Sequence, residues 1–263
     1  MSDPNVLLER DGVRLASEDA VATVTLCNPD KRNAQSPALW RALTEAGRLL
    51  PGSVRVVVLR AEGVSFSAGL DRQAFTPEGF EGEPSFADLA RGSEKELDVT
   101  IAAYQDAFTW WRRNDLITIA AVHGHAIGAG FQLALACDLR VVADDAQFAM
   151  RETSLGLVPD LGGTKPLTDL VGYGRALEIC ATGRYVHGAE AERIGLANLL
   201  VPGADLDAAV LDLAAAILAA PRDAVIETKA LLRDASGRAY DDQRAAERAA
   251  QARRLRDLAG VGE

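Results

Sequence analysis

The chain has few cysteines and no pattern that would hold a metal or a disulfide framework. Only three occur in 263 residues, Cys27, Cys137 and Cys180, and no two of them form a Cys-x-x-Cys pair. A small, odd number of scattered cysteines is typical of buried thiols in a reducing compartment. His123 and His125 stand close together but lack further ligands nearby, and a structural zinc site takes four. We therefore expect a cytoplasmic protein without a bound metal.

Long apolar runs, leader sequences and short phosphate-binding motifs are also missing. No apolar stretch reaches the roughly 18 residues that a membrane-spanning helix needs. The first five residues lack the basic-then-apolar order of a secretory signal. There is no Gly-x-Gly-x-x-Gly loop, no Gly-Lys-Ser/Thr loop and no Gly-x-Ser-x-Gly elbow. These absences argue against a membrane partner, secretion, the common nucleotide loops and serine-hydrolase chemistry.

Basic residues are outnumbered by acidic ones. Lys and Arg total 28 against 38 Asp and Glu, which gives a formal net charge of −10. Because nucleic-acid binding draws its affinity from a basic surface, we expect no nucleic-acid partner. A chain of this length with 48% hydrophobic residues can bury a large core. It fits one domain, or one domain with a small appendage.

The sequence does contain two glycine-bearing corners about 60 residues apart. The first, 66–71, follows an apolar strand at 55–59, and the second, 124–132, follows another at 117–122. Each is predicted to lead into a helix. Glycine lets a ligand approach the backbone, and a helix start adds unpaired N–H donors and the positive end of its dipole. Two converging N–H groups would form an oxyanion hole, although either corner alone is also compatible with an ordinary turn.

Hydrophobic periodicity predicts an α/β core. Residues 6–10 and 21–26 are predicted strands, and strands alternate with helices from 117 to 201. A further helix is predicted to begin with Ser36 as its N-cap and a proline in its first turn. The stretch 72–100, rich in Gly, Pro, Glu and Asp, is predicted to be a long loop with a short helix, and the next helix to begin near its end.

Beyond the core the sequence becomes alanine-rich and helical. We predict no strand after residue 201, so the core would occupy 1–201 and a helical region 202–263. Four apolar residues recur at helical spacing in this region: Leu206, Val210, Leu213 and Ile217. A small core would leave such a stripe uncovered, and symmetric association would bury it. We therefore expect a homo-oligomer.

These features together resemble the crotonase family, the enoyl-CoA hydratase/isomerase group, over roughly residues 6 to 255. Ser-Ala-Gly-Leu-Asp ends the first corner, and Gly-His-Ala-Ile-Gly-Ala-Gly-Phe-Gln forms the second. Shorter matches lie at 28–34, 146–148, 156–159 and 162–164. The resemblance implies a spiral core of repeated ββα turns and a C-terminal helical region that builds trimers or dimers of trimers. It also implies an acyl-CoA thioester as substrate, with no cofactor beyond the coenzyme A that the substrate carries.

By resemblance, the acid–base chemistry falls on Glu152. Hydratases of this family have glutamates at two positions, held here by Gln132 and, twenty residues on, Glu152. Glutamine can hold a water but cannot exchange protons at neutral pH, so hydration by two glutamates is disfavoured. One carboxylate suffices to move a proton from C2 to C4 of a 3-enoyl-CoA. We therefore favour double-bond isomerisation over hydration of a 2-enoyl-CoA.

Asp160 is a second candidate for acid–base chemistry. It lies eight residues after Glu152, at a position where hydratases of the family usually have glycine. The family's dienoyl-CoA isomerases have an aspartate at this spacing. Those isomerases also have an acid where Gln132 stands, so this chain holds two of their three acidic positions. Two nearby carboxylates would have their pKa values pushed apart, but Asp160 also fits a turn or a helix cap. The alternative function is a non-catalytic acyl-CoA-binding or carrier protein. Such a protein would also have an intact oxyanion hole with fewer catalytic bases.

The resemblance also assigns the binding groups. The oxyanion donors would be the backbone N–H groups of Leu70 and Ala129. The remaining residues assigned to the substrate path belong to the two corners: Ala68, Gly69, Asp71 and Gly128. Asp71 would also cap the helix after the first corner.

Coenzyme A is a polyanion, so an acidic protein must concentrate basic residues where it binds. Lys31 and Arg32 of one subunit, with Lys229 or Arg233 of a neighbour, are the candidates for this patch. Each of the four is otherwise an ordinary solvated surface charge.

Overall fold

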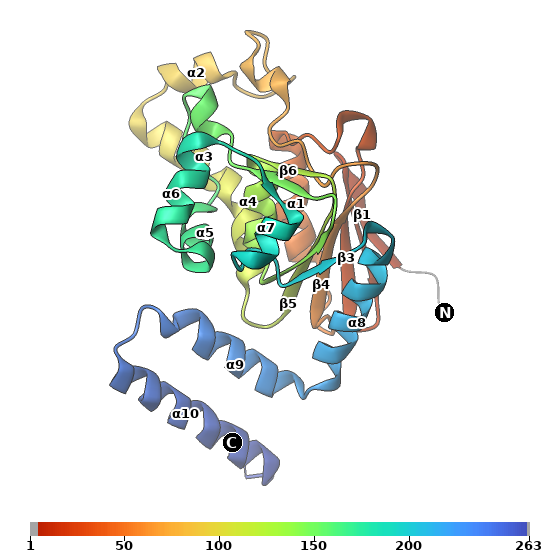
Figure 1. The fold of residues 1–263 in the computed structure, drawn as a ribbon, viewed down its shortest axis with the longest axis vertical. Coiled ribbons are helices and arrows are strands. Elements are labelled where there is room, and N and C mark those ends of the chain that lie inside the picture. Colours follow the sequence, from red (N-terminus) through yellow and green to blue (C-terminus); the bar gives the residue numbers. More distant parts are fainter. Residues whose placement is uncertain (1–4, 262–263) are drawn as a thin grey trace.

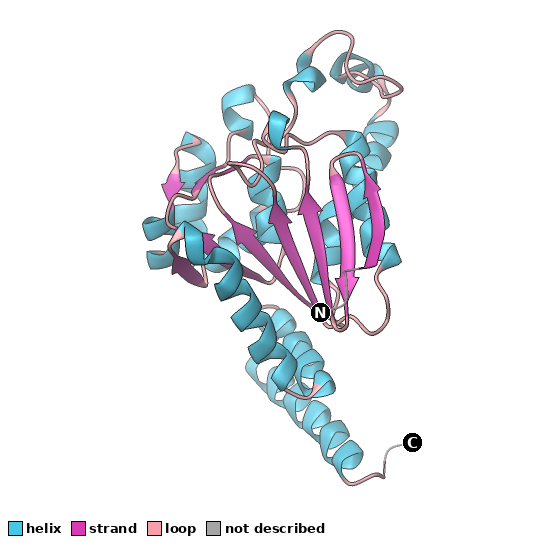
Figure 2. Ribbon diagram, turned by 90° about the vertical axis from the view of Figure 1, so that its right-hand side faces the viewer, coloured by secondary structure: helices cyan, strands magenta, loops and turns pink. Residues whose placement is uncertain are grey.

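Seven strands form the main sheet of the structure, a computed structural model that describes residues 5–261. In spatial order they are β1 (Asn5–Arg10), β2 (Val13–Glu18), β3 (Val21–Leu26), β4 (Val56–Ala61), β5 (Ile117–Val122), β7 (Leu139–Ala143) and β10 (Leu199–Val201). The first three strands pair antiparallel, and the pairings from β3 to β10 are parallel (Figure 2). Residues 1–4, on which the expectation about a secretory signal largely rests, lie outside the described range.

A second, smaller sheet gives the fold its spiral. It contains β6 (His125–Ile127), β8 (Gln147–Ala149) and β9 (Val186–His187). The chain visits the two sheets in turn: β5 and β6 lead to α4 (Ala129–Ala136), and β7 and β8 lead to α5 (Thr164–Val171) and α6 (Tyr173–Thr182). This repeated strand–strand–helix order confirms the predicted fold class, an α/β spiral of ββα turns (Figure 1).

The central parallel strands β4 and β5 are buried on both faces, as their largely apolar sequences favour. In β4, Val57 and Leu59 belong to one core, while Val56 and Val58 belong to the other. The first core lies on the side of α1 (Pro37–Leu49), α3 (Glu94–Thr109) and α4, and the second lies under α8 (Leu206–Ala219). The sheet is therefore a middle layer between helices.

The expectation that the stripe on α8 is left uncovered is wrong. Leu206, Val210 and Ala214 are only 7%, 3% and 2% exposed, because they pack on the sheet face that the other helices leave free. Leu213 and Ile217 pack against the same cluster while remaining partly exposed. The last strand ends at the predicted boundary, but α8 packs as part of the core.

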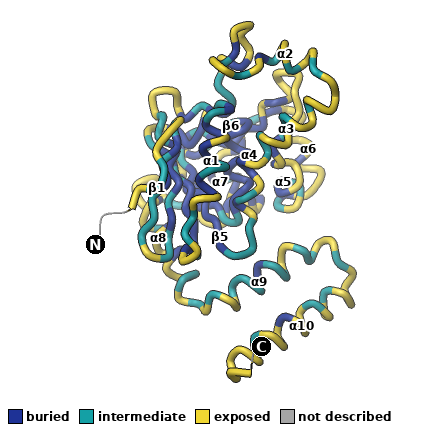
Figure 3. The backbone as a smooth tube through the Cα atoms, turned by 180° about the vertical axis from the view of Figure 1, so that it is seen from behind, coloured by how far each residue is buried: buried dark blue, intermediate teal, exposed yellow. Residues whose placement is uncertain are grey.

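The last two helices project from the core. α9 (Arg222–Ala235) and α10 (Tyr240–Leu258) form a hairpin that extends past the edge of the sheet (Figure 1). Figure 3 shows most of this hairpin as half-buried or exposed. Within it, Lys229 and Ala250 are the buried residues. The tail thus presents long surfaces that its own core does not cover.

Local structure departs from the predictions at several short elements. The strands β2 and β6 were not predicted, and the first corner leads into a 3-10 turn, Arg72–Phe75, in place of a helix. α2 (Phe86–Arg91) is the short helix predicted within 72–100, whereas α3 begins earlier than predicted, at Glu94, because Ser93 and Glu96 form a capping box. α7 (Gly188–Arg193) completes the helices. Ser36 caps α1 as predicted.

Two compositional expectations concern the cysteines and the membrane. Cys137 is a buried free thiol, and Cys27 and Cys180 are half-buried free thiols. In the described part of the chain, no helix has both the length and the apolar character that crossing a bilayer requires.

Candidate active site

The two predicted corners lie against each other at the ends of β4 and β5. Ser67 donates its N–H to His125 O (2.8 Å), and its carbonyl accepts from Ile127 N (3.0 Å). The first corner is thereby added as a short strand beside β6, which leads into α4. Residues about 60 positions apart in the sequence thus share one backbone ladder.

Glycine is required where the corners cross. Gly69 has φ +83°, and a Cβ there would lie 2.4 Å from Ile127 O and 3.6 Å from Ala129 N. A Cβ on Gly130 would lie 2.7 Å from the Cβ of Ser67. Larger residues would push the two corners apart.

The two predicted oxyanion donors are therefore close together. Leu70 follows Gly69 directly, and Ala129 is the first residue of α4. Among the described residues, neither N–H donates to an acceptor within the protein. An unpaired N–H at the start of a helix, with a second one beside it, is the arrangement that stabilises negative charge on a carbonyl oxygen.

Glu152 lies directly behind the second corner. It begins the 3-10 turn Glu152–Leu155 and is 9% exposed. Gly128 has φ +51°, which strains any other residue, and a Cβ there would press on the carboxylate at 3.3 Å from Glu152 Oε1. The carboxylate thus lies beside Gly128, the residue that precedes Ala129.

Gln132 holds one oxygen of Glu152. The amide of Gln132 is buried on α4 and donates from Nε2 to Glu152 Oε1 (2.7 Å). Its own Oε1 accepts from the backbone N–H groups of Leu161 (2.9 Å) and Gly163 (3.3 Å). These two donors fix which end of the amide is oxygen. Gln132 therefore presents an N–H, and no acceptor, to Glu152.

The other oxygen of Glu152 has no hydrogen-bond partner. Oε2 is buried and unpaired within the described structure. Burial raises the pKa of Glu152, and the negative charge of Asp160 adds to this rise. The nearby backbone N–H groups of Glu152 and Arg151 and the hydrogen bond from Gln132 oppose it. A buried carboxylate with a raised pKa and one free oxygen is suited to take up and return a proton.

Asp160 is half-buried and close enough to influence Glu152. Burial raises its pKa as well. Its backbone carbonyl accepts from Gln105 Nε2 of α3 (2.6 Å), which ties the loop before α5 to that helix. The N-cap of α5 is Gly163, so Asp160 does not cap this helix. The structure thus brings Glu152, Gln132 and Asp160 together. The bond from Gln105 to the Asp160 carbonyl was not predicted, because nothing in the local sequence of Gln105 marks it.

Lys31 and Arg32 lie beside the first corner. Arg32 O accepts from Ala68 N (2.9 Å), and Lys31 Nζ contacts Asp71 Oδ2 (3.0 Å). Both basic side chains are exposed. Asp71 caps the 3-10 turn by accepting from Gln73 N (3.0 Å). Although burial alone would raise it, the pKa of Asp71 is lowered by that bond and by Lys31.

Asn33 holds this segment in place, a role that the sequence did not reveal. Its side chain is fully buried and donates to the carbonyls of Glu62 and Ser65, both at 2.9 Å. Its Oδ1 accepts from Asn28 N (2.9 Å). Arg32 and Asn33 both have positive φ, +50° and +52°, which these bonds stabilise.

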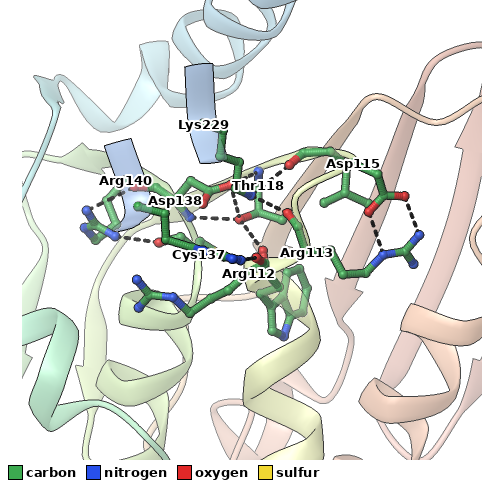
Figure 4. A network of polar contacts seen from close by, with 11 residues as sticks. Arg112, Arg113, Asp115, Thr118, Cys137, Asp138, Arg140 and Lys229 are labelled. Carbon is green, nitrogen blue, oxygen red and sulfur yellow. Dashed lines mark hydrogen bonds and ion pairs between the residues drawn. The ribbon is translucent and has the colours of Figure 1, made fainter. Parts of the chain in front are cut away.

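The prediction that Lys229 offers a free charge to coenzyme A is wrong. Its Nζ donates to Arg113 O (2.6 Å), Leu116 O (2.8 Å) and Asp138 Oδ2 (2.7 Å), as Figure 4 shows. An ammonium group has three donors, and all three are used. Burial lowers the pKa of Lys229, which Asp138 partly offsets. Lys229 therefore anchors α9 to the core.

Arg233, the other candidate on α9, is exposed. One of its guanidinium nitrogens donates to Arg112 O (3.2 Å). It stays on the surface, far along the chain from Lys31 and Arg32.

Comparison with known proteins identifies the family to which this fold belongs. Residues 16–257 match the family model of enoyl-CoA hydratase/isomerase. A candidate enoyl-CoA hydratase of Thermobifida fusca YX, solved in complex with CoA, is 47% identical with a TM-score of 0.90, and the match covers 95% of each chain. The same protein has been solved in complex with acetoacetyl-CoA.

Characterised relatives differ in their reactions. The human mitochondrial Delta(3,5)-Delta(2,4)-dienoyl-CoA isomerase is 35% identical over 81% of this chain and 66% of its own length. The hydroxycinnamoyl-CoA hydratase-lyase of Pseudomonas fluorescens is 32% identical over 78% of this chain and 72% of its own length.

Proposed function

The chain belongs to the enoyl-CoA hydratase/isomerase family, and from this premise we propose that it moves the double bond of a 3-enoyl-CoA through a thioester enolate. The substrate would lie with its thioester oxygen between the N–H groups of Leu70 and Ala129. Its C2 would face the free Oε2 of Glu152. The fold alone does not select a reaction, because function depends on the site.

The proposed reaction needs only one carboxylate. Glu152 takes a proton from C2, and the electron pair of that C–H bond delocalises onto the thioester oxygen. The N–H groups of Leu70 and Ala129 stabilise this negative charge. The carboxyl of Glu152 then returns the proton at C4, the electron pair moves from oxygen back into the carbon chain, and the double bond lies between C2 and C3.

The contact between Gln132 and Glu152 carries the preference for isomerisation. Hydration requires a second group that exchanges a proton with water. The amide oxygen of Gln132 is already occupied by two backbone N–H groups, so it does not accept from a water. Its Nε2 instead fixes Oε1 of Glu152 and leaves Oε2 free for the substrate.

A dienoyl-CoA shift is the second candidate, and Asp160 favours it. This half-buried carboxyl raises the pKa of Glu152 by its charge and has a raised pKa itself. Two groups of this kind would move protons at separate carbons of a longer conjugated system. The Asp160→Asn variant separates the two candidates: it should lose dienoyl-CoA isomerisation and keep most 3-enoyl-CoA isomerisation.

We also propose that the active protein is a cytoplasmic homo-oligomer, a trimer or a dimer of trimers. The exposed apolar residues of the projecting hairpin support this: Leu232, Tyr240, Leu255 and Leu258 are 70%, 79%, 56% and 84% exposed. A single chain leaves them in water, and a second copy would cover them. Light scattering that reports a monomer at micromolar concentration would defeat this proposal.

The phosphates of coenzyme A are proposed to meet Lys31 and Arg32, joined by Arg233 of a neighbouring subunit. The net charge of −10 makes such a local patch necessary. Reversing the charges of Lys31 and Arg32 should weaken CoA binding. The difference in CoA affinity between wild type and this variant should shrink at high salt. Unchanged affinity at low salt would exclude both residues from the site.

The test of the reaction is a panel of 2-enoyl-, 3-enoyl- and dienoyl-CoA thioesters, with products followed by mass and ultraviolet absorbance. We expect turnover of a 3-enoyl-CoA without gain of mass, and slower addition of water to a 2-enoyl-CoA. Faster hydration than isomerisation would contradict the proposal. Binding of every thioester without turnover would favour the non-catalytic alternative.

A further inference from the structure

A chain of buried polar side chains lies beneath the first corner. Trp40 Nε1 donates to Gln35 Oε1 (2.8 Å), and Gln35 Nε2 donates to Ser67 Oγ (3.2 Å). Gln35 and Ser67 are fully buried, and Trp40 is 6% exposed. A buried amide is costly unless it is hydrogen-bonded, and here both ends are bonded.

The hydroxyl of Ser67 has all its hydrogen-bonding capacity in use. It donates to Asn33 O (2.7 Å) and accepts from Gly69 N (3.2 Å) as well as from Gln35 Nε2. A hydroxyl has one donor and two acceptor sites. Gln35 Nε2 fills the second acceptor site of the hydroxyl. The hydroxyl oxygen is therefore held in the orientation that accepts from Gly69 N.

The backbone of Gln35 forms hydrogen bonds to the same corner on either side of Leu70. Its N–H donates to Gly69 O (2.7 Å), and its carbonyl accepts from Asp71 N (2.8 Å). In such a parallel bridge, the residue between the two bonded groups turns its own N–H to the opposite side. The direction of the Leu70 N–H thus depends on how this strand segment is held.

We propose that Gln35 is a positioning residue for the oxyanion donor Leu70 N–H, acting through the hydroxyl of Ser67. The inference rests on the proposed function, in which that N–H holds the thioester oxygen. Ser67 also pairs through its backbone with the segment that leads to Ala129, so its placement sets the distance between both donors. Gln35 itself contacts no substrate.

Removing the amide should weaken the hole without removing a donor. In Gln35→Leu, the Ser67 hydroxyl keeps its bonds to Asn33 O and Gly69 N but loses the one from Gln35 Nε2. Its oxygen is then held less firmly as the acceptor of Gly69 N, and the direction of the Leu70 N–H is less sharply fixed. Loss of a whole oxyanion donor typically costs about 10²–10³-fold in turnover. We expect about a tenfold loss for a donor that is present but misplaced.

Acetoacetyl-CoA reports the hole directly, because its enolate form absorbs in the ultraviolet and needs no turnover. The measurement is the enolate fraction of bound acetoacetyl-CoA for wild type and Gln35→Leu, together with the affinity for CoA alone. Gln35→Leu should lower the enolate-to-keto ratio about tenfold and leave CoA affinity unchanged. Thr118→Val is the matched control, because it also removes a buried polar side chain with several hydrogen bonds, here a hydroxyl on the side of Asp138. It should lower Tm without lowering the enolate ratio.

Gln35→Glu adds a pH readout and a second route if Gln35→Leu does not fold. When protonated, its carboxyl can accept from Trp40 and donate to Ser67, as the amide does; when ionised, it cannot donate. Its enolate ratio relative to wild type should be near one at low pH and fall as pH rises. A ratio equal to wild type at every pH, or an unchanged ratio in folded Gln35→Leu, would overturn the positioning role. No excess enolate on wild type would instead show that the oxyanion hole itself is wrongly assigned.

Discussion

Replacing Gln132 with glutamate tests whether one ionisable group or two should stand at this site. In the native protein, Gln132 Nε2 and Glu152 Oε1 are 2.7 Å apart. The backbone N–H groups of Leu161 and Gly163 would hold one oxygen of the new carboxylate, so its other oxygen would face Glu152. The variant Gln132→Glu therefore replaces an attractive contact with two like charges.

The size of this repulsion follows from the distance. Two unit charges 2.7 Å apart repel by about 6 kcal/mol at an effective dielectric constant of roughly 20. Each factor of ten in an equilibrium corresponds to about 1.4 kcal/mol, so the pair should keep one proton bound at neutral pH. Glu152 is then a poorer base for C2, and the two groups become an acid and a base that can together activate water.

The assay is the pH dependence of kcat/KM for both reactions. Gln132→Glu should lower isomerisation of a 3-enoyl-CoA near pH 7, shift its acidic limb to higher pH, and raise hydration of a 2-enoyl-CoA. Gln132→Met is the matched control, since it removes the hydrogen bonds without adding a charge and should lower isomerisation without raising hydration. An isomerisation profile that does not move, with no gain in hydration, would refute this account of Gln132.

Three further variants test other parts of the structure. Glu152→Gln should lower turnover by about 10²–10⁴-fold while acetoacetyl-CoA still binds. Because burial raises the pKa of Glu152, wild-type kcat/KM should fall on acidification at a higher pH than an ordinary glutamate would give. Gly69→Ala should lose about 100-fold or more in turnover, because its Cβ would lie 2.4 Å from Ile127 O; wild-type kinetics would show that the corners can separate freely. Lys229→Met should lower the free energy of unfolding by about 2–3 kcal/mol, measured by urea denaturation, because it leaves a partly buried carboxylate unpaired; no loss would mean that α9 is anchored elsewhere.

The sequence predicted the parts of the fold that local pattern controls. Both corners were found because glycine follows an apolar strand in each, and the caps at Ser36 and Asp71 were found because these side chains act on the next turn. The strand β6 has only three residues, too few for a period to appear. Such short elements form through pairing with distant strands, which a local window does not contain.

The errors concern what covers a surface and which partner a side chain meets. The stripe on α8 was recognised as apolar, but periodicity does not say whether a sheet of the same chain or another subunit packs on it. The sequence predicts Lys229 for the coenzyme A patch and does not reveal its burial, because its acceptors are 91 to 116 positions away. The sequence marks Gln132 as a candidate, but the direction of its amide depends on two backbone N–H groups about 30 residues later.

The central claim is that a single carboxylate, Glu152, both removes and returns the proton. A 3-enoyl-CoA labelled with deuterium at C2, converted in ordinary water, tests it most directly, because a carboxyl that is 9% exposed exchanges its proton with solvent slowly. The account predicts that part of the 2-enoyl-CoA product carries deuterium at C4, as seen by mass spectrometry. A product that never carries the label at C4, or that forms chiefly by addition of water, would contradict it.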